Sequence, residues 1–65
     1  MTGTTVEAVR CMADDAVYIE STPGVVRVSL APVESPMSSV RMTADGAIEL
    51  ARLLLASAQR ARKVE

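Results

Sequence analysis

Residues 16–31 read AVYIESTPGVVRVSLA, and this stretch predicts a β-hairpin. Both halves alternate between apolar and polar side chains, as strands do when one face is buried. The apolar set on that face is Val17, Ile19, Val26, Val28 and Leu30. Between the halves, Pro23 suits the second position of a type I or II turn, and Gly24 suits the positive φ of type II. We therefore expect antiparallel strands over residues 16–21 and 25–31.

The segments around this hairpin extend the predicted sheet. Residues 6–12 are apolar with interspersed charges and predict a strand, although their alternation is imperfect, and Ala13-Asp14-Asp15 predicts a turn. Residues 32–37 predict a loop, since a proline supplies no donor to a central ladder. Residues 38–42 then predict a short strand with Val40 and Met42 inward.

A helix is expected from Ala44 to about Arg62, because good helix formers dominate this segment. Thr43 is the candidate N-cap, and Asp45 places a negative charge in the first turn. The whole chain is then one domain, residues 1–65: a frayed N-terminus (1–5), strands (6–42), a capped helix (43–62) and a tail (63–65). The predicted fold is α+β, a three- to four-stranded antiparallel β-meander with one C-terminal amphipathic helix packed on one face.

The predicted helix is apolar over an arc of about 220°, whereas an ordinary surface helix needs a stripe of little more than about 100°. One small sheet covers only part of this arc. We expect the core to contain Val17, Ile19, Val26, Val28, Leu30, Val40, Met42, Ala47, Leu50, Ala51, Leu54 and Ala58. The flank around Leu50 and Leu53 is left over, so either loop 32–37 or a second protein chain covers it.

This flank predicts a homodimer with a helical interface, because twofold pairing is the commonest way for identical chains to cover such a patch. The predicted interface residues are Leu50, Leu53, Ser57, Ala61 and Tyr18. Tyr18 is included because tyrosines are enriched at protein interfaces. A protein partner other than the chain itself is the alternative occupant.

The composition argues against a self-contained active site. Histidine is absent, Cys11 is the only cysteine, and the three glycines are isolated, so we expect no catalytic residues, no cofactor and no metal site. Cys11 is interpreted as a small buried apolar residue of a strand, and Asp14 and Asp15 as a solvated turn. The chain shows no targeting signal and no apolar run long enough for a bilayer, which predicts a cytoplasmic protein without membrane contact.

Basic residues suggest an alternative function, a small nucleic-acid-binding regulator. Arg10, Arg27 and Arg41 lie in three different predicted strands, and a second basic group closes the chain, namely Arg60, Arg62 and Lys63. The net charge of −1 and the presence of a single aromatic residue, Tyr18, too few for a base-stacking surface, disfavour this function. Without a binding role, the strand arginines would belong to a solvated face of mixed charge. The C-terminal basic residues would then complement the negative end of the helix dipole.

Residues 40–61, VRMTADGAIELARLLLASAQRA, resemble a pattern found in small uncharacterised proteins of actinobacteria and their phages, in which short strands precede a Thr-capped Ala/Leu helix. The matching positions are Met42, Thr43, Asp45, Ala47, Leu50, Ala51, Leu54 and Ala58. Gly46 departs from the Glu or Gln common in that pattern. The resemblance implies a small accessory protein, such as a phage product that binds a host protein. Our leading expectation is therefore a non-catalytic protein-interaction module that self-associates.

Overall fold

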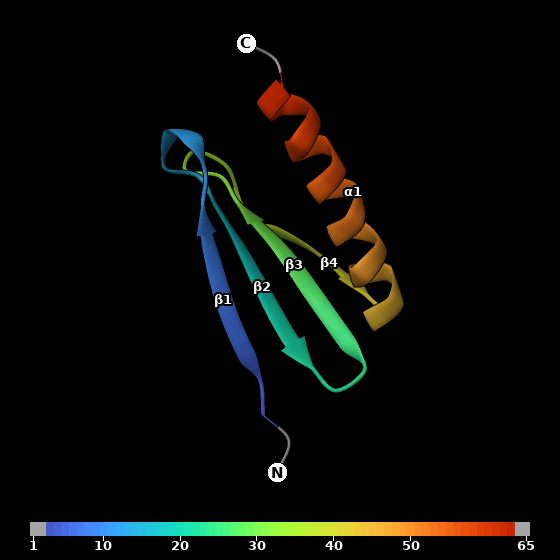
Figure 1. Ribbon diagram of the computed structural model, residues 1–65. Helices are drawn as coiled ribbons and strands as arrows, with labels where there is room; N and C mark the ends of the chain where they lie inside the picture. The colour runs from blue at the N-terminus through green and yellow to red at the C-terminus, as the bar shows by residue number, and fades with distance from the viewer. Residues whose placement is uncertain (1–2, 64–65) are drawn as a thin grey trace.

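The computed structural model of the chain describes residues 3–63 and consists of one antiparallel sheet followed by one helix (Figure 1). The elements are β1 (Thr5–Arg10), the 3-10 turn η1 (Met12–Asp14), β2 (Ala16–Thr22), β3 (Val25–Ala31), β4 (Ser38–Met42) and α1 (Ala44–Lys63). The strands lie in the order β1-β2-β3-β4, with every neighbouring pair antiparallel. The predicted α+β meander is thus confirmed.

The central hairpin forms where the sequence predicts it. Thr22 pairs with Val25, so Pro23 and Gly24 alone make the connection. Gly24 adopts a φ of 87°, the left-handed value that a type II turn requires at its third position. This short connection fixes the register, and the apolar positions of β2 and β3 therefore meet across the ladder.

The first strand is shorter than predicted. It begins at Thr5 and ends at Arg10, so the expected strand over residues 6–12 is wrong at its C-terminal end. The Cys11 N–H donates to the Asp15 carbonyl at 2.8 Å, which closes a tight turn and turns Met12 out of the ladder. Thr5 belongs to β1 rather than to a frayed segment, and the part of the predicted frayed N-terminus at residues 1–2 lies outside the described residues.

The strand register divides the sheet into two chemically different faces. Cross-strand partners point to the same side, so the partner lists assign each residue to a face. The apolar face carries Thr5, Glu7, Val9, Val17, Ile19, Ser21, Val26, Val28, Leu30, Ser38, Val40 and Met42. The outer face carries Val6, Ala8, Arg10, Ala16, Tyr18, Glu20, Thr22, Val25, Arg27, Ser29, Ala31, Ser39 and Arg41.

The helix starts as the sequence predicts. The hydroxyl of Thr43 accepts a hydrogen bond from the Gly46 N–H at 3.1 Å, and its carbonyl accepts from the Ala47 N–H at 2.9 Å. Asp45 lies in the first turn, and three basic residues occupy the last. Lys63 is still helical, so the helix extends one residue beyond its predicted end; residues 64–65 of the predicted tail lie outside the described part.

The helix returns along the apolar face, on the side of β3 and β4 (Figure 1). It leaves β1 and β2 uncovered on that face. Its closest approach is at its start, where Gly46 comes against Met42 at the end of β4. Gly46, Ala47 and Leu50 are half-buried there.

The predicted core is wrong in one respect: its residues lie on the expected face, but none of them is buried. Within residues 3–63, Ser29 is the single buried residue, and it lies on the outer face. Leu30, Val40, Ala51, Leu54 and Ala58 are exposed, and the other predicted core residues are half-buried. The physical reason is that the helix leans on the sheet only through its first turns, so one layer has no second layer to close it.

Candidate protein-interaction surface

The open part of the apolar face is the main candidate site. Val9 on β1 is 52% exposed, Leu30 on β3 is 50% exposed and Val40 on β4 is 61% exposed. Among the twelve residues of this face, Glu7 is the only charged one. A continuous sheet face of this composition in contact with water is characteristic of a surface that another protein covers.

The helix contributes a second uncovered apolar surface. Leu54 lies close to the middle of the helix's apolar arc, where a helix packed on its own sheet has its most buried side chains. It is nevertheless 61% exposed. Leu53, Leu55 and Ile48 are also more than half exposed. The helix therefore presents its apolar arc to solvent over most of its length.

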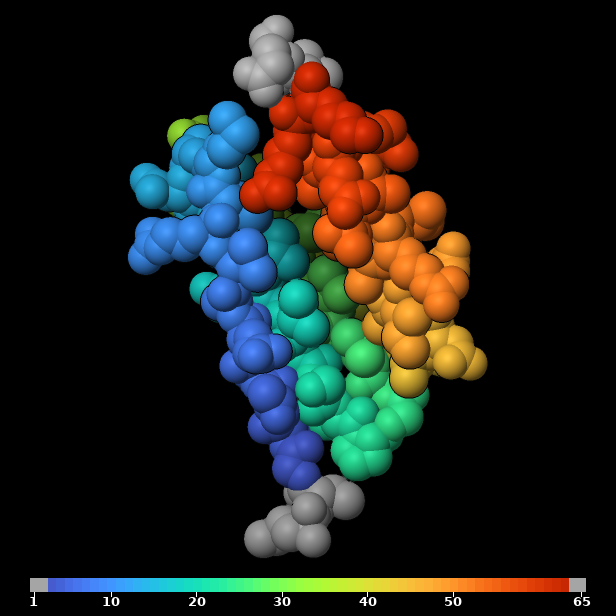
Figure 2. All heavy atoms as spheres, in the orientation of Figure 1, coloured from blue at the N-terminus to red at the C-terminus, as the bar shows by residue number. Residues whose placement is uncertain are grey.

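The gap between these two surfaces is visible in space-filling view. Figure 2 shows a hollow between α1 on one side and β1 on the other, with side chains of β2 and β3 at its floor. Both walls and the floor come from the apolar face and the helix. We call the exposed residues of the apolar face together with the exposed apolar residues of α1 the open apolar surface.

The chain as a whole exposes more surface than its mass predicts. The chain exposes 5581 Å², whereas a folded chain of its mass is expected to expose about 4,000 Å². It thus buries roughly 45% of the surface of its unfolded state, where about 60% is usual for a domain near this length. The radius of gyration of 13.5 Å agrees, since about 11 Å is expected for this number of residues.

The predicted cover for this surface within the chain does not form. Loop 32–37 turns to the other side of the sheet, where Met37 lines a shallow depression with Tyr18 and other outer-face residues. The loop is held near the β1–β2 turn, because the Asp15 carboxylate accepts a hydrogen bond from the Val33 N–H at 2.9 Å. Of the two covers that the sequence left open, the loop is excluded.

The predicted interface residues do not all come together. Leu53 is 59% exposed and Leu50 is half-buried against the sheet. Ser57 and Ala61 are exposed on the same helix, and the Ser57 hydroxyl accepts a hydrogen bond from Arg60 at 3.0 Å. Tyr18 lies on the outer face, so the structure separates it from the four helical residues. Sequence reasoning assigned Leu54 to the core and so missed its exposure, because the tilt of a helix on a sheet is set by tertiary contacts.

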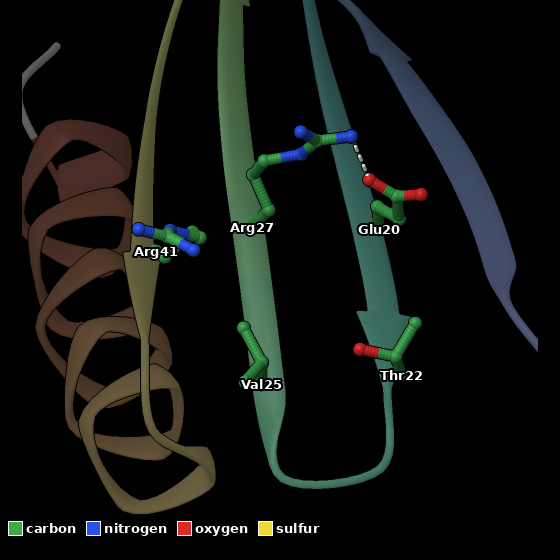
Figure 3. A pocket seen from close by; sticks show the side chains of 5 residues that line it. All are labelled: Glu20, Thr22, Val25, Arg27 and Arg41. Atoms are coloured by element: carbon green, nitrogen blue, oxygen red, sulfur yellow. Dashed lines mark hydrogen bonds and ion pairs between the residues drawn. The ribbon is translucent and has the colours of Figure 1, made fainter.

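The outer face carries Arg10, Arg27 and Arg41, the three strand arginines that the sequence suggested for binding of nucleic acid. Arg27 and Arg41 are direct cross-strand partners, and with Glu20, Thr22 and Val25 they line a shallow pocket (Figure 3). Arg27 forms an ion pair with Glu20 on β2. Arg41 forms no ion pair with another residue of the described chain. The helix lies on the far side of the sheet from these side chains (Figure 3).

The remaining basic residues lie apart from this pocket. Arg10 is at the other end of the sheet, where it pairs with Ala16 and lines a depression with Asp14 and Asp15. Arg62 and Lys63 line a small depression with Gln59 near the end of the helix. The structure thus divides the predicted nucleic-acid contacts into three separate groups.

Candidate reactive and metal-binding groups are few. Cys11 is exposed at the end of β1, so its interpretation as a buried strand residue is wrong; the early end of the strand places it in the turn. Asp14 is exposed in that turn and has a φ of 66°. Between residues 3 and 63, no three of the side chains that commonly bind metals gather closely enough to hold an ion.

No family model, curated protein or solved structure matches this chain. The described helix is not long and apolar enough to cross a membrane. The function of the open apolar surface is therefore inferred from the composition and exposure of its residues.

Proposed function

We propose that this chain is a non-catalytic protein-interaction module, and that the open apolar surface is where it binds protein. One observation carries the proposal: within residues 3–63, no apolar side chain is buried. Burial of apolar surface is the dominant favourable term in folding, and a single layer of half-exposed residues gains little of it. A protein partner would supply the missing half of the core. A phage-encoded accessory protein that binds a host protein would belong to this class.

The composition of the surface supports a protein as the occupant. The centres of protein interfaces are depleted in charge and enriched in large apolar side chains. The large exposed side chains of the open apolar surface are valine, leucine and isoleucine. Its exposed polar residues on the sheet, Thr5, Glu7 and Ser38, lie on the edge strands or at the end of the face. The outer face, with its four charged residues, is suited to contact with water.

Site-specific photocrosslinking in living cells tests the proposal. A benzophenone amino acid replaces either Leu54, on the open apolar surface, or Met37, on the outer-face side; both side chains are 61% exposed. We expect position 54 to form a covalent protein adduct and position 37 to form none. Absence of any protein adduct at position 54, or equal adducts at both positions, would refute the proposed function.

A second function, binding of nucleic acid by the outer face, is supported by one observation. Arg27 and Arg41 lie directly opposite each other, and only Glu20 compensates them within the pocket. Like charges in this relation destabilise a sheet unless an anion lies nearby. Binding of labelled single-stranded and duplex DNA at low salt would support this function if it weakened steeply with added salt and with Arg41→Ala, but not with Arg52→Ala. No binding at low salt excludes it.

A further inference from the structure

We infer that the protein on the open apolar surface is a second copy of this chain, held as a closed twofold pair. In this pair, the helix of each copy packs against the uncovered part of the other copy's apolar face. The inference rests on the proposed function, and names its partner. Three properties of the chain carry it: the area left exposed, the two apolar sides of the helix and the inability of one copy to bury a core.

The exposed area matches what a stable dimer buries. Each chain exposes about 1,600 Å² more than a folded protein of its mass. If a pair removed that excess from both copies, the interface would total about 3,200 Å², inside the range of roughly 2,000–5,000 Å² that obligate homodimers bury. A standard-size contact with an unrelated protein buries about 800 Å² on each side. Such a contact would leave about half of the excess in water.

The helix is built to lie between two surfaces. Leu50 faces the chain's own sheet and is half-buried. Ile48 and Leu55 lie roughly 140–160° around the helix from Leu50, so they cannot face that sheet, and both are more than half exposed. A helix that is apolar on both sides is expected in a buried position. A partner's sheet on the second side would provide this environment.

Both halves of the required contact are present in one chain. Each copy offers an uncovered apolar sheet face beside β1 and β2, and each offers a helix with an uncovered apolar side. A twofold axis brings each helix onto the other copy's sheet, so the same contact covers the open sheet face and the open side of the helix. The sheet face carries little charge that would repel its own copy. A single copy buries too little surface for independent stability, so the partner must be present whenever the chain is folded.

Sedimentation velocity of the purified chain tests the inference, with two substitutions of matched starting exposure. We expect the wild type to sediment as a dimer, at twice its 6.9 kDa mass. Leu54→Glu places an unpaired charge in the interface twice per dimer, and should raise the dissociation constant at least about 100-fold. Met37→Glu, on the opposite side of the sheet, should leave the constant within about threefold of wild type.

Loss of the fold in Leu54→Glu, with Met37→Glu intact, supports the inference equally, because a side chain this exposed in a self-sufficient monomer has few contacts to lose. A folded wild-type monomer at high micromolar concentration overturns it, and so does a dimer that both substitutions leave unchanged. A mass that keeps growing with concentration contradicts the closed pair.

The single cysteine allows a second measurement on the wild-type sequence. Cys11 is exposed, so separate samples can be labelled there with a donor and an acceptor dye. Mixing should produce energy transfer that excess unlabelled chain abolishes. Absence of transfer, combined with a position-54 crosslink to a different protein, would overturn the second copy and leave the proposed function standing. Absence of any position-54 crosslink would refute both.

Discussion

The two faces of the sheet share the same four strands but differ in how they meet water. The outer face mixes arginines, a glutamate and small polar residues with alanines, two valines and Tyr18, and it holds the one buried residue between residues 3 and 63, Ser29. The apolar face carries valines, isoleucine, leucine and methionine, yet none of them is buried. The alternation of apolar and polar residues along the strands therefore specifies which face of the sheet must be covered. It does not supply the second layer that covers this face, and the helix of this chain covers only part of it.

Two adjacent valines give the largest expected difference between the faces. Val25 lies on the outer face beside Arg27 and Arg41, and Val26 lies on the apolar face opposite Met42. We expect Val26→Glu to destabilise the protein by about 3 kcal/mol or more, because its charge would be buried without a partner in the assembled protein. Val25→Glu should change stability by less than about 1 kcal/mol. Urea unfolding followed by circular dichroism measures both.

Equal effects of the two glutamates would show that both faces are solvated in the working state of the protein. That result would contradict the distinction between an outer face and an apolar face, which is assigned from the strand register alone.

The start of the helix, where α1 touches its own sheet, should show an intermediate effect. Thr43→Ala removes the acceptor for the Gly46 N–H, and loss of such a cap typically costs about 1 kcal/mol. Thr43→Ser keeps the hydroxyl and should leave stability close to that of the wild type, because serine is at least as good an N-cap as threonine. If alanine and serine behave alike in urea unfolding, the cap does not hold the helix in place.

The smallest expected effect is a gain. A Cβ at Gly46 would meet the Thr43 hydroxyl at 3.4 Å and the Met42 Cβ at 3.6 Å, which are ordinary contacts. Gly46→Ala should therefore raise stability by about 0.5–1 kcal/mol through helix propensity. Gly24→Ala is the opposite control, because its φ of 87° disfavours a side chain. A destabilised Gly46→Ala would mean that the helix packs more tightly on β4 than these distances indicate.

Local signals were sufficient for most of the fold. The Pro23-Gly24 turn and the alternation of apolar and polar residues in β2 and β3 predicted the hairpin, because both signals depend on residues only a few positions apart. Thr43 and Asp45 gave the helix start for the same reason. The predicted end of β1 was wrong, since apolar residues continue through Cys11 and Met12. The hydrogen bond that ends the strand, from the Cys11 N–H to the Asp15 carbonyl, does not appear in the pattern.

The sequence predicted uncovered apolar surface on the helix, but not which residues form it. The wide apolar arc of the helix correctly indicated more apolar surface than one sheet covers. It could not show that Leu54 would remain exposed and Leu50 would lie against the sheet, because the tilt of a helix on a sheet is set by tertiary contacts. The path of loop 32–37 likewise depends on the bond between Asp15 and Val33, which join segments far apart in sequence.

The central claim is that one copy of this chain cannot complete its own core, and the dependence of unfolding on protein concentration tests it most directly. Urea unfolding is followed by circular dichroism at about 100 μM and again at about 1 μM. If folding requires a second copy, this hundredfold dilution should lower the apparent stability by about 2.7 kcal/mol and shift the urea midpoint downward accordingly. A midpoint that is the same at both concentrations, with a cooperative transition, would contradict the account.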